Sequence, residues 1–311
     1  MLSKPFRFGV QIQRAESARE WREKARKAEG LGFDILLMAD HFGPQLGIAP
    51  ALAVAAEATT TLRIGQLVLQ NDLRHPALLA KEIATLDLLS EGRFELGIGA
   101  GGSYLPDFDW TGIRFDPAGV RVERLRESVT VLKGLFADRP FTFAGQHFTI
   151  TDYDGQPKPV QRPHPPILIG AGGPRMMELA AMEADIIGLL PAMRREGGDY
   201  ALDDLSVPAL DRKVNYIRQV AKNRFDEIEF NSLTQVLDVT DNRSAAIDRL
   251  REEWQPGGGE WQESPFLLIG STSSIADSVR EYRETLGFSY FVMRNQMIDD
   301  FAPILATLKG T

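Results

Sequence analysis

The chain has 311 residues, of which 43% are hydrophobic and 25% charged, and this composition excludes disordered and collagen-like proteins. Its 35 Lys and Arg residues against 43 Asp and Glu residues give a net charge of −8, which argues against a nucleic acid partner because phosphate binding needs a cationic face. The absence of cysteine excludes disulfides and thiolate chemistry. No apolar stretch approaches the roughly 18 residues that span a bilayer, and the first ten residues have no apolar targeting core. We therefore expect a soluble, cytoplasmic protein that does not contact membranes.

Short β-rich runs alternate along the chain with longer segments of helical periodicity. The predicted strands cover residues 6–12, 35–39, 63–69, 94–98, a run that begins at 166–169, 185–190, part of 229–239, and 288–293. The predicted helices cover residues 17–31, 48–60, 76–89, 117–136, 174–183, 207–222, 244–253, 273–286 and 298–308. Eight strands separated by helices predict an α/β protein of the (β/α)₈ TIM barrel class, in which residues 1–311 form a single domain.

Two segments interrupt this alternation. Residues 141–149 alternate around Ala144-Gly145 and predict a small hairpin before strand five. Residues 255–265, rich in glycine and proline, predict an insertion after strand seven that forms a flap near the barrel mouth.

The active site of such a barrel is built at the carboxyl ends of its strands, so the residues at these ends are the candidates for chemistry. No lysine ends a strand, which disfavours a Schiff-base aldolase, and strand four ends in glycines rather than in one carboxylate of a glycosidase pair. Strand one lacks the paired histidines of a metal hydrolase, so no metal site is predicted. This mouth has little chemistry of its own, which favours a cofactor that carries the reaction.

Asp40 and His41 end strand two and are the sharpest candidates. We expect Asp40 to hydrogen-bond the edge of a cofactor ring and His41 to relay a proton near the reacting carbon. The alternative is structural, with Asp40 capping the next helix and His41 filling a gap. The position at a barrel strand end favours the functional interpretation.

Two glycine-rich turns complete the predicted mouth. After strand five, Ala171, Gly172 and Gly173 lead into a helix, and their free amides with Arg175 would cradle a phosphate; a tight turn with no ligand explains the pattern equally well. After strand four, Gly99 and Gly101 imitate a dinucleotide fingerprint, but no helix follows directly, so a Rossmann site is rejected. These two glycines are expected to leave room for a flat ring.

The remaining candidates concern the substrate side and the other histidines. The aromatic residues on loops near the mouth either line an apolar pocket or pack on the surface; they are Tyr104, Phe108, Trp110 and Trp261. His75, His147 and His164 have no metal-ligand spacing, and His75 is expected to cap or pack a helix start. We assign the substrate pocket to Gln11, Gln45, Tyr104 and Arg294.

Four runs together resemble the luciferase-like monooxygenase superfamily, and within it the coenzyme F420-dependent oxidoreductases. They are ADHF at 39–42, NDLRHPALLAKE at 71–82, DLLSEGRFELGIGAGG at 87–102 and PKPVQRPHPPILIGAGGP at 157–174. The resemblance implies a barrel with a flavin or deazaflavin at its mouth, Asp40 and His41 beside the ring, and a phosphate-binding turn at Ala171, Gly172 and Gly173. It also implies homodimerisation and a cis peptide in strand three, which falls by position at Gln66–Leu67.

One departure from the family pattern bears on the substrate. F420-dependent sugar-phosphate dehydrogenases of this superfamily have a Glu after the strand-four glycines and a Trp shortly after the Asp-His pair. The matching positions here hold Gly102 and Gln45, which disfavours glucose-6-phosphate oxidation.

These observations lead to one main hypothesis and two alternatives. The main hypothesis is reversible hydride transfer between F420 and a small organic substrate, with His41 as proton donor or acceptor. The first alternative is an FMN-dependent monooxygenase supplied with reduced flavin by a separate reductase. The second is a flavin or deazaflavin carrier that has lost its chemistry.

Overall fold

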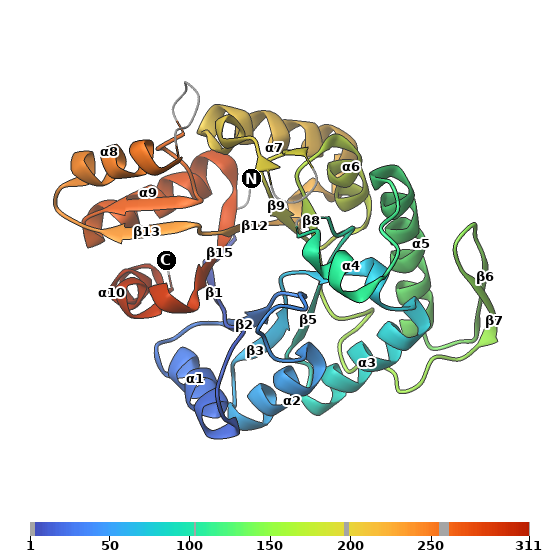
Figure 1. Ribbon diagram of the computed structural model, residues 1–311. Helices are drawn as coiled ribbons and strands as arrows, with labels where there is room; N and C mark the ends of the chain where they lie inside the picture. Colours follow the sequence, from blue (N-terminus) through green and yellow to red (C-terminus); the bar gives the residue numbers. More distant parts are fainter. Residues whose placement is uncertain (1–3, 103, 196–198, 255–260, 311) are drawn as a thin grey trace.

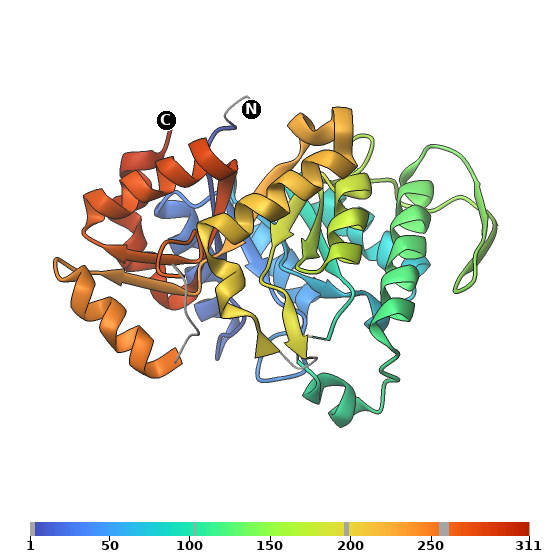
Figure 2. The ribbon, with the colours of Figure 1, turned by 90° about the horizontal axis from the view of Figure 1, so that it is seen from above.

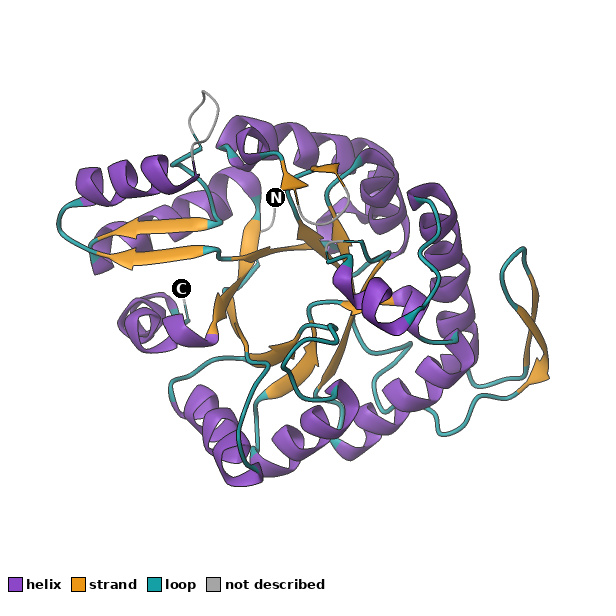
Figure 3. Cartoon of the chain, in the orientation of Figure 1, coloured by secondary structure: helices purple, strands orange, loops and turns teal. Residues whose placement is uncertain are grey.

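A closed parallel barrel forms the centre of the computed structural model, which describes residues 4–102, 104–195, 199–254 and 261–310 (Figure 1, Figure 3). The strand order is β3-β2-β1-β15-β12-β9-β8-β5-β4, and pairing of β3 with β5 closes the ring. Because β3 and β4 share one position, the ring has the eight positions of a TIM barrel, as predicted. The bounds are β1 (Arg7–Gln11), β2 (Ile35–Met38), β3 (Arg63–Gln66), β4 (Leu69–Gln70), β5 (Phe94–Gly99), β8 (Ile167–Ala171), β9 (Ile186–Leu189), β12 (Glu229–Leu233) and β15 (Phe288–Arg294).

Helices surround the barrel and cover the outer faces of its strands (Figure 1, Figure 2). These are α1 (Ala18–Gly30), α2 (Ile48–Ala58), α3 (Pro76–Leu89), α5 (Ala118–Phe136), α6 (Pro174–Glu183), α7 (Val207–Ala221), α9 (Thr272–Leu286) and α10 (Ile298–Leu308). Two further helices lie elsewhere: α4 (Pro106–Thr111) in the loop after β5, and α8 (Arg243–Trp254) on the outside of the molecule. Four 3₁₀ segments also occur in the described residues: Asn71–Leu73, Leu202–Leu205, Lys222–Glu227 and Asn295–Met297. In the ranges that the structure describes, no helix combines the length and apolar character needed to cross a bilayer.

The helices begin where local capping chemistry permits. The Ser17 side chain accepts a hydrogen bond from Glu20 N at the start of α1, and the apolar stripe of that helix buries Trp21. His75 caps α3 by accepting from Ala77 N, as expected for this histidine, and its ring packs edge-on against Phe148. The ends of the predicted helices agree with the observed ends to within two residues. The sequence pattern did not predict α4.

The chain after strand seven differs from the prediction. The predicted run 229–239 divides into β12, which belongs to the barrel, and β13 (Val236–Val239), which leaves it. β13 pairs in parallel with β14 (Leu267–Gly270), an unpredicted strand, and forms a two-stranded sheet beside the barrel with α8 (Figure 1). The end of β13 therefore does not reach the mouth.

The predicted flap is also different where it is described. Residues 255–260 lie outside the described part of the chain. Residues 261–265 pack against the body: Trp261 is 3% exposed and lies against Trp254, and the Ser264 hydroxyl donates to Leu205 O. Trp261 is thus a core residue of the insertion and not an aromatic of the mouth, because the β13–β14 sheet needs an apolar face to pack on.

The predicted hairpin is confirmed. β6 (Phe141–Ala144) and β7 (Thr149–Tyr153) pair in antiparallel and project from the body beside α5 (Figure 1, Figure 2). Glu127 of α5 accepts hydrogen bonds from the backbone N–H groups of Gln146, His147 and Phe148, which ties the hairpin turn to the helix. A second antiparallel pair, β10 (Met193–Arg195) and β11 (Asp199–Tyr200), follows β9.

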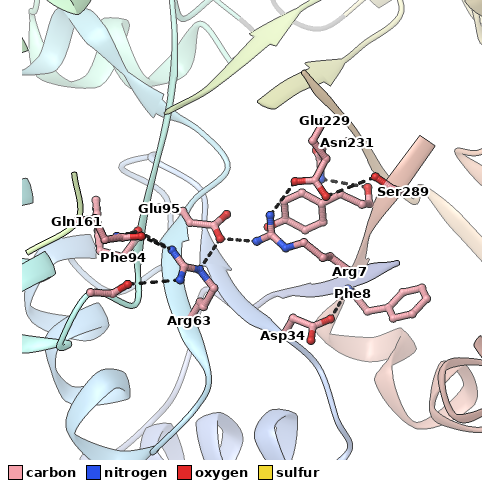
Figure 4. A network of polar contacts seen from close by, with 12 residues as sticks. Arg7, Phe8, Asp34, Arg63, Phe94, Glu95, Gln161, Glu229, Asn231 and Ser289 are labelled. Atoms are coloured by element: carbon pink, nitrogen blue, oxygen red, sulfur yellow. Dashed lines mark hydrogen bonds and ion pairs between the residues drawn. The ribbon is translucent and has the colours of Figure 1, made fainter. Parts of the chain in front are cut away.

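An ion-pair network closes the end of the barrel where the strands begin (Figure 4). Arg7 of β1 pairs with Glu95 of β5 and, at 2.7 Å, with Glu229 of β12, and Arg63 of β3 also pairs with Glu95. Burial raises the pKa of Glu229 above its ordinary value, although Arg7 lowers it. The Arg7 guanidinium lies 4.5 Å above the Tyr290 ring. Four strands distant in sequence thus meet in one charged layer below the apolar barrel interior.

Candidate functional site

His41 lies just after β2, at the carboxyl end of the barrel, and its ring is held by a carboxylate from α4. The distance between His41 Nδ1 and Asp107 Oδ2 is 2.6 Å. Asp107 is fully buried and also accepts from Phe42 N at 2.8 Å and from Gln70 Nε2 at 2.8 Å. An ionised carboxylate can only accept hydrogen bonds, so His41 donates through Nδ1 and its Nε2 is the nitrogen available for chemistry.

Asp107 is the functional residue that sequence reasoning missed. It lies after strand four, where the sequence pattern predicts no helix, and α4 has only six residues, too few to show helical periodicity. The available signal was Pro106 at the first turn followed by acidic residues, which is typical of a helix start.

Asp40 has partners different from the expected one. Its carboxylate oxygens accept from Arg74 Nη1 at 2.6 Å and Nη2 at 3.2 Å, and from Gln70 N at 3.0 Å. The same glutamine donates through Nε2 to Asp40 O at 2.7 Å. Asp40 therefore does not present a free carboxylate edge at the mouth. It holds Gln70, which in turn contacts the carboxylate that holds His41.

A pocket of about 340 Å³ opens beside His41, between the loops that follow β1, β2 and β5. Its lining residues are Gln13, Arg14, His41, Gly43, Pro44, Gln45 and Tyr104. The Tyr104 ring lies edge-on to His41, with 5.5 Å between centroids, and Gln45 Nε2 donates to Ala39 O at 2.9 Å. Gln45 and Tyr104, both predicted for the substrate side, thus lie with His41. Trp110 is 60% exposed and stacks edge-on with Tyr104, whereas Phe108 is buried.

Strand three ends in the cis peptide that the resemblance implies, one position later than expected. The cis bond is Leu67–Val68, and the predicted Gln66–Leu67 bond is trans. Gln66 is buried in β3, and Gln11 at the end of β1 donates through Nε2 to Leu67 O at 3.0 Å. Leu67, Val68 and Leu233 pack on the inner apolar cluster of the barrel, so the floor of the mouth is aliphatic.

The turn after β8 contains one glycine with open space beside it. Gly173 is the N-cap residue of α6 and makes no side-chain cap, and a Cβ built on it would meet nothing within 4 Å. Gly172 is different, because a Cβ there would lie 2.7 Å from Pro191 O. Ala171 is buried as the last residue of β8, and Arg175 is exposed on the first turn of α6.

Lys213 of α7 fixes the backbone of this turn by hydrogen bonds to backbone carbonyl oxygens. Its ammonium donates to Gly172 O at 3.1 Å and to Leu190 O at 2.7 Å, and it pairs with Asp204. Burial lowers the pKa of Lys213, and the Asp204 carboxylate partly opposes this effect. The backbone of the turn is thus fixed while the face at Gly173 stays free.

The glycines after β5 adopt conformations that other residues rarely adopt. Gly101 has φ +73° and Gly102 φ +99°, and Arg121 of α5 donates to Gly101 O at 2.8 Å. A Cβ on Gly102 would lie 2.5 Å from Arg121 Nη1. The positive φ favours glycine at both positions, so a side chain at position 102 would be strained and would displace the Arg121 guanidinium. Gly99, which ends β5, faces Val68, whose side chain a Cβ would touch at 3.0 Å.

Arg294 ends β15, in register with Gln11 of β1, and donates to Gln235 Oε1 at 2.7 Å. It lies at the mouth but does not line the pocket beside His41. The structure therefore brings all the predicted site residues to the carboxyl end of the barrel and separates them into a histidine pocket, a glycine cradle after β8, and an arginine at β15.

Comparison with known proteins places this geometry in a family. Residues 1–289 match the family model for luciferase-like monooxygenases. An F420-dependent glucose-6-phosphate dehydrogenase from Intrasporangium calvum is 33% identical, and the match covers 94% of this chain and 95% of that protein. A protein of the same description from Amycolatopsis mediterranei is 35% identical, but the match covers 54% of this chain and only 52% of that relative. The F420-dependent tetrahydromethanopterin reductase of Methanopyrus kandleri has the same fold, with a TM-score of 0.77, 19% identity and coverage of 98% and 99% of the two chains.

Proposed function

Because the chain belongs to the luciferase-like monooxygenase family, we propose that it is an oxidoreductase that uses coenzyme F420 to transfer a hydride to or from a small organic substrate. The relative with full coverage is described as F420-dependent. The single structural observation that carries the proposal is the His41–Asp107 pair beside the pocket. This pair supplies one oriented proton donor or acceptor. The described residues contain no group of three or more His, Asp or Glu side chains that could hold a metal ion.

The described residues fit a planar ring with a phosphate tail. The aliphatic floor at Leu67, Val68 and Leu233 offers an apolar surface to one face of a ring. Gln70 Oε1 lies next to Gly101 and is buried without a hydrogen-bond partner. This oxygen could accept a hydrogen bond from a ring N–H. The open face at Gly173, with the first amides of α6 and Arg175, would hold the phosphate.

When bound, F420 supplies a ring carbon that accepts or donates a hydride. The chain's own contribution is to position the substrate and to move a proton. His41 Nε2 would donate a proton to, or accept one from, the reacting oxygen, and Asp107 would keep the imidazole in the Nδ1–H form and stabilise its charged state. Asp40 and Arg74 would act indirectly, because they hold Gln70 in its contact with Asp107.

We expect glucose-6-phosphate to be a poor substrate, although the relative with full coverage is described as acting on it. The positions that hold a Glu and a Trp in the sugar-phosphate dehydrogenases are Gly102 and Gln45 here. The positive φ at position 102 favours glycine, and no carboxylate is available at this position in this chain. Gln45 lines the pocket and offers an amide in place of an aromatic surface.

Fluorescence titration of the purified protein with F420 and with FMN, each oxidised and reduced, tests the cofactor. Tight binding of F420 with weak binding of FMN is the expected result. Binding of reduced FMN without affinity for F420 would establish the monooxygenase alternative. Tight F420 binding with no turnover across a broad panel of alcohols and carbonyl compounds would establish the carrier alternative.

Gly173→Val tests the cradle, because the fold tolerates a side chain there. We expect the Kd for F420 to rise about tenfold or more, since the new side chain would occupy the space of one phosphate contact. The matched control is Gly30→Val, also in open space but at the end of α1, which should leave F420 binding unchanged. Equal binding by both variants would place the cofactor elsewhere.

His41→Ala tests the proton role. Turnover should fall by about 10² to 10⁴, the usual contribution of a positioned acid or base, while the Kd for F420 changes little. Unchanged turnover would remove His41 from the mechanism.

We also propose that residues 1–311 form one domain, that the protein acts in the cytoplasm on a small molecule without binding nucleic acid, and that it is a homodimer. The net charge of −8 supports the absence of a nucleic acid partner. The support for a dimer is the outer face of α3, where Leu78, Leu88 and Leu89 are 54%, 48% and 63% exposed. Light scattering should give a dimer for the wild type and a monomer for Leu89→Glu; a monomeric wild type would contradict this.

A further inference from the structure

Arg294 lies at the mouth, and no carboxylate of the described residues forms an ion pair with it. It is the last residue of β15, and β15 lies between β1 and β12 in the ring of strands (Figure 1). The carboxyl ends of these strands carry Gln11, Leu233 and Arg294, so a guanidinium faces the same end of the barrel as the His41 pocket. The side chain is partly buried and therefore still reachable from the mouth.

The guanidinium has a single hydrogen-bond acceptor among the described residues. That acceptor is Gln235 Oε1 at 2.7 Å, whereas a guanidinium carries five N–H donors. Gln235 is itself fixed, because its Nε2 donates to Leu233 O at 3.0 Å. The amide thus orients the arginine without neutralising it.

Three other cations near this end of the barrel are paired with carboxylates. Arg74 pairs with Asp40, Arg124 pairs with Asp72 and Asp116, and Lys213 pairs with Asp204. Gln11, which is paired with Arg294 on β1, and Gln235, which follows β12 and contacts Arg294, are both uncharged amides. Burial accordingly lowers the pKa of Arg294, and no carboxylate among the described residues opposes this.

Arg294 is partly desolvated and, within the described part of the chain, has one orienting partner and no carboxylate beside it. Such an arginine is costly to the fold unless a ligand supplies the missing charge. A planar guanidinium binds carboxylate and phosphate oxygens through two parallel hydrogen bonds. We propose that Arg294 binds an oxyanion of the substrate, a carboxylate or a phosphate, so that the substrate of the proposed F420-dependent reaction is an anionic molecule. This inference rests on the proposed function and adds the substrate class to it.

The test measures oxyanion binding to the F420-loaded protein, in which the cofactor already fills the glycine cradle. The probes are two pairs that differ in charge, benzoate with benzamide and phenyl phosphate with phenol, each titrated by calorimetry. The first pair tests a carboxylate and the second a phosphate. The variants are Arg294→Gln, which removes the charge, and Arg294→Lys, which keeps it. Arg251→Gln on the exposed face of α8 is the matched control.

We expect the wild type to bind at least one anion more tightly than its neutral partner. Arg294→Gln should raise the Kd for that anion about tenfold or more, as expected for loss of a charged hydrogen bond, and leave the neutral probe unchanged. Arg294→Lys should keep most of the preference, and Arg251→Gln all of it. Retention of the preference in Arg294→Lys shows that the loss in Arg294→Gln comes from charge and not from misfolding.

Three results would overturn the inference. The first is equal binding of charged and neutral probes by the wild type, and the second is an unchanged anion preference in Arg294→Gln. The third is loss of the preference in Arg14→Gln instead, since Arg14 lines the His41 pocket. Failure of the proposed function looks different, because the wild type would then not bind F420 in the loading step. A weaker Kd for F420 itself in Arg294→Gln would assign this arginine to the cofactor and so also overturn the inference.

Discussion

Replacement of Arg7 by methionine should destabilise the barrel through the two carboxylates that it leaves behind. Glu95 keeps Arg63 as a partner, so Glu229 is the group that loses its ion pair. The side chains of these two glutamates are 4% and 10% exposed. Breaking a buried pair by removing one partner costs about 3–5 kcal/mol, and we expect the lower end, about 3 kcal/mol, because methionine retains contact with the Tyr290 ring.

The pH dependence gives this prediction an internal check. Burial holds the pKa of Glu229 above its ordinary value of 4.5, and Arg7 opposes that shift, so removing Arg7 raises the pKa further. A carboxyl whose pKa is raised in the folded state contributes stability that is fully present below 4.5 and lost as the pH rises through the folded pKa. The cost of Arg7→Met should therefore be larger at about pH 8 than at about pH 5.

Urea unfolding at the two pH values measures both effects. The double variant Arg7→Met/Glu229→Gln should recover most of the loss, since no charge is then left unpaired at that position. Arg251→Met, at an exposed ion pair on α8, is the matched control and should cost less than about 0.5 kcal/mol. A cost below about 1 kcal/mol for Arg7→Met near pH 8, or one that does not decrease near pH 5, would refute the reasoning.

Three further changes have defined outcomes. Asp107→Asn keeps the shape but removes the charge that holds His41, so turnover should fall about 10- to 100-fold while F420 fluorescence titration gives an unchanged Kd; equal turnover would show that the pair is only structural. Burial raises the pKa of Glu29, but hydrogen bonds from backbone N–H groups outweigh this effect and lower the pKa to about 2. The stabilisation that Glu29 provides is therefore present above pH 4.5 and is lost as the pH falls towards 2. Glu29→Gln should cost about 1 kcal/mol near neutral pH and flatten acid unfolding curves in that range. Gly97→Ala places a Cβ 1.9 Å from a carbonyl oxygen of β3 and should cost more than about 3 kcal/mol in urea unfolding. At Gly170 the nearest atom to a new Cβ is 3.7 Å away, so Gly170→Ala should cost less than about 1 kcal/mol. Similar costs for the two variants would contradict the steric argument.

Local patterns were sufficient for the barrel and for the position of the histidine. Strand and helix periodicities depend only on residues a few positions apart, so the alternation from Arg7 to Leu308 could be predicted without knowing any long-range contact. The carboxyl ends of parallel strands meet at one edge whatever their side chains, which is why His41 and Gly173 could be assigned to the same mouth. The open face at Gly173 agrees with that assignment.

Partners of side chains were decided only by the tertiary structure. The hydrogen bonds from Arg74 to Asp40 were not predicted, and neither was the bond between His41 and Asp107, which lies on a helix too short to show periodicity. The departure of β13 from the barrel to pair with β14 was equally invisible, since the run 229–239 was predicted to contain a single barrel strand. Hydrogen bonds and ion pairs join groups 30 to more than 200 positions apart, as Asp40 to Arg74 and Arg7 to Glu229 do. Such pairings depend on how elements pack in space, and a periodicity confined to a few neighbouring residues contains no information about them.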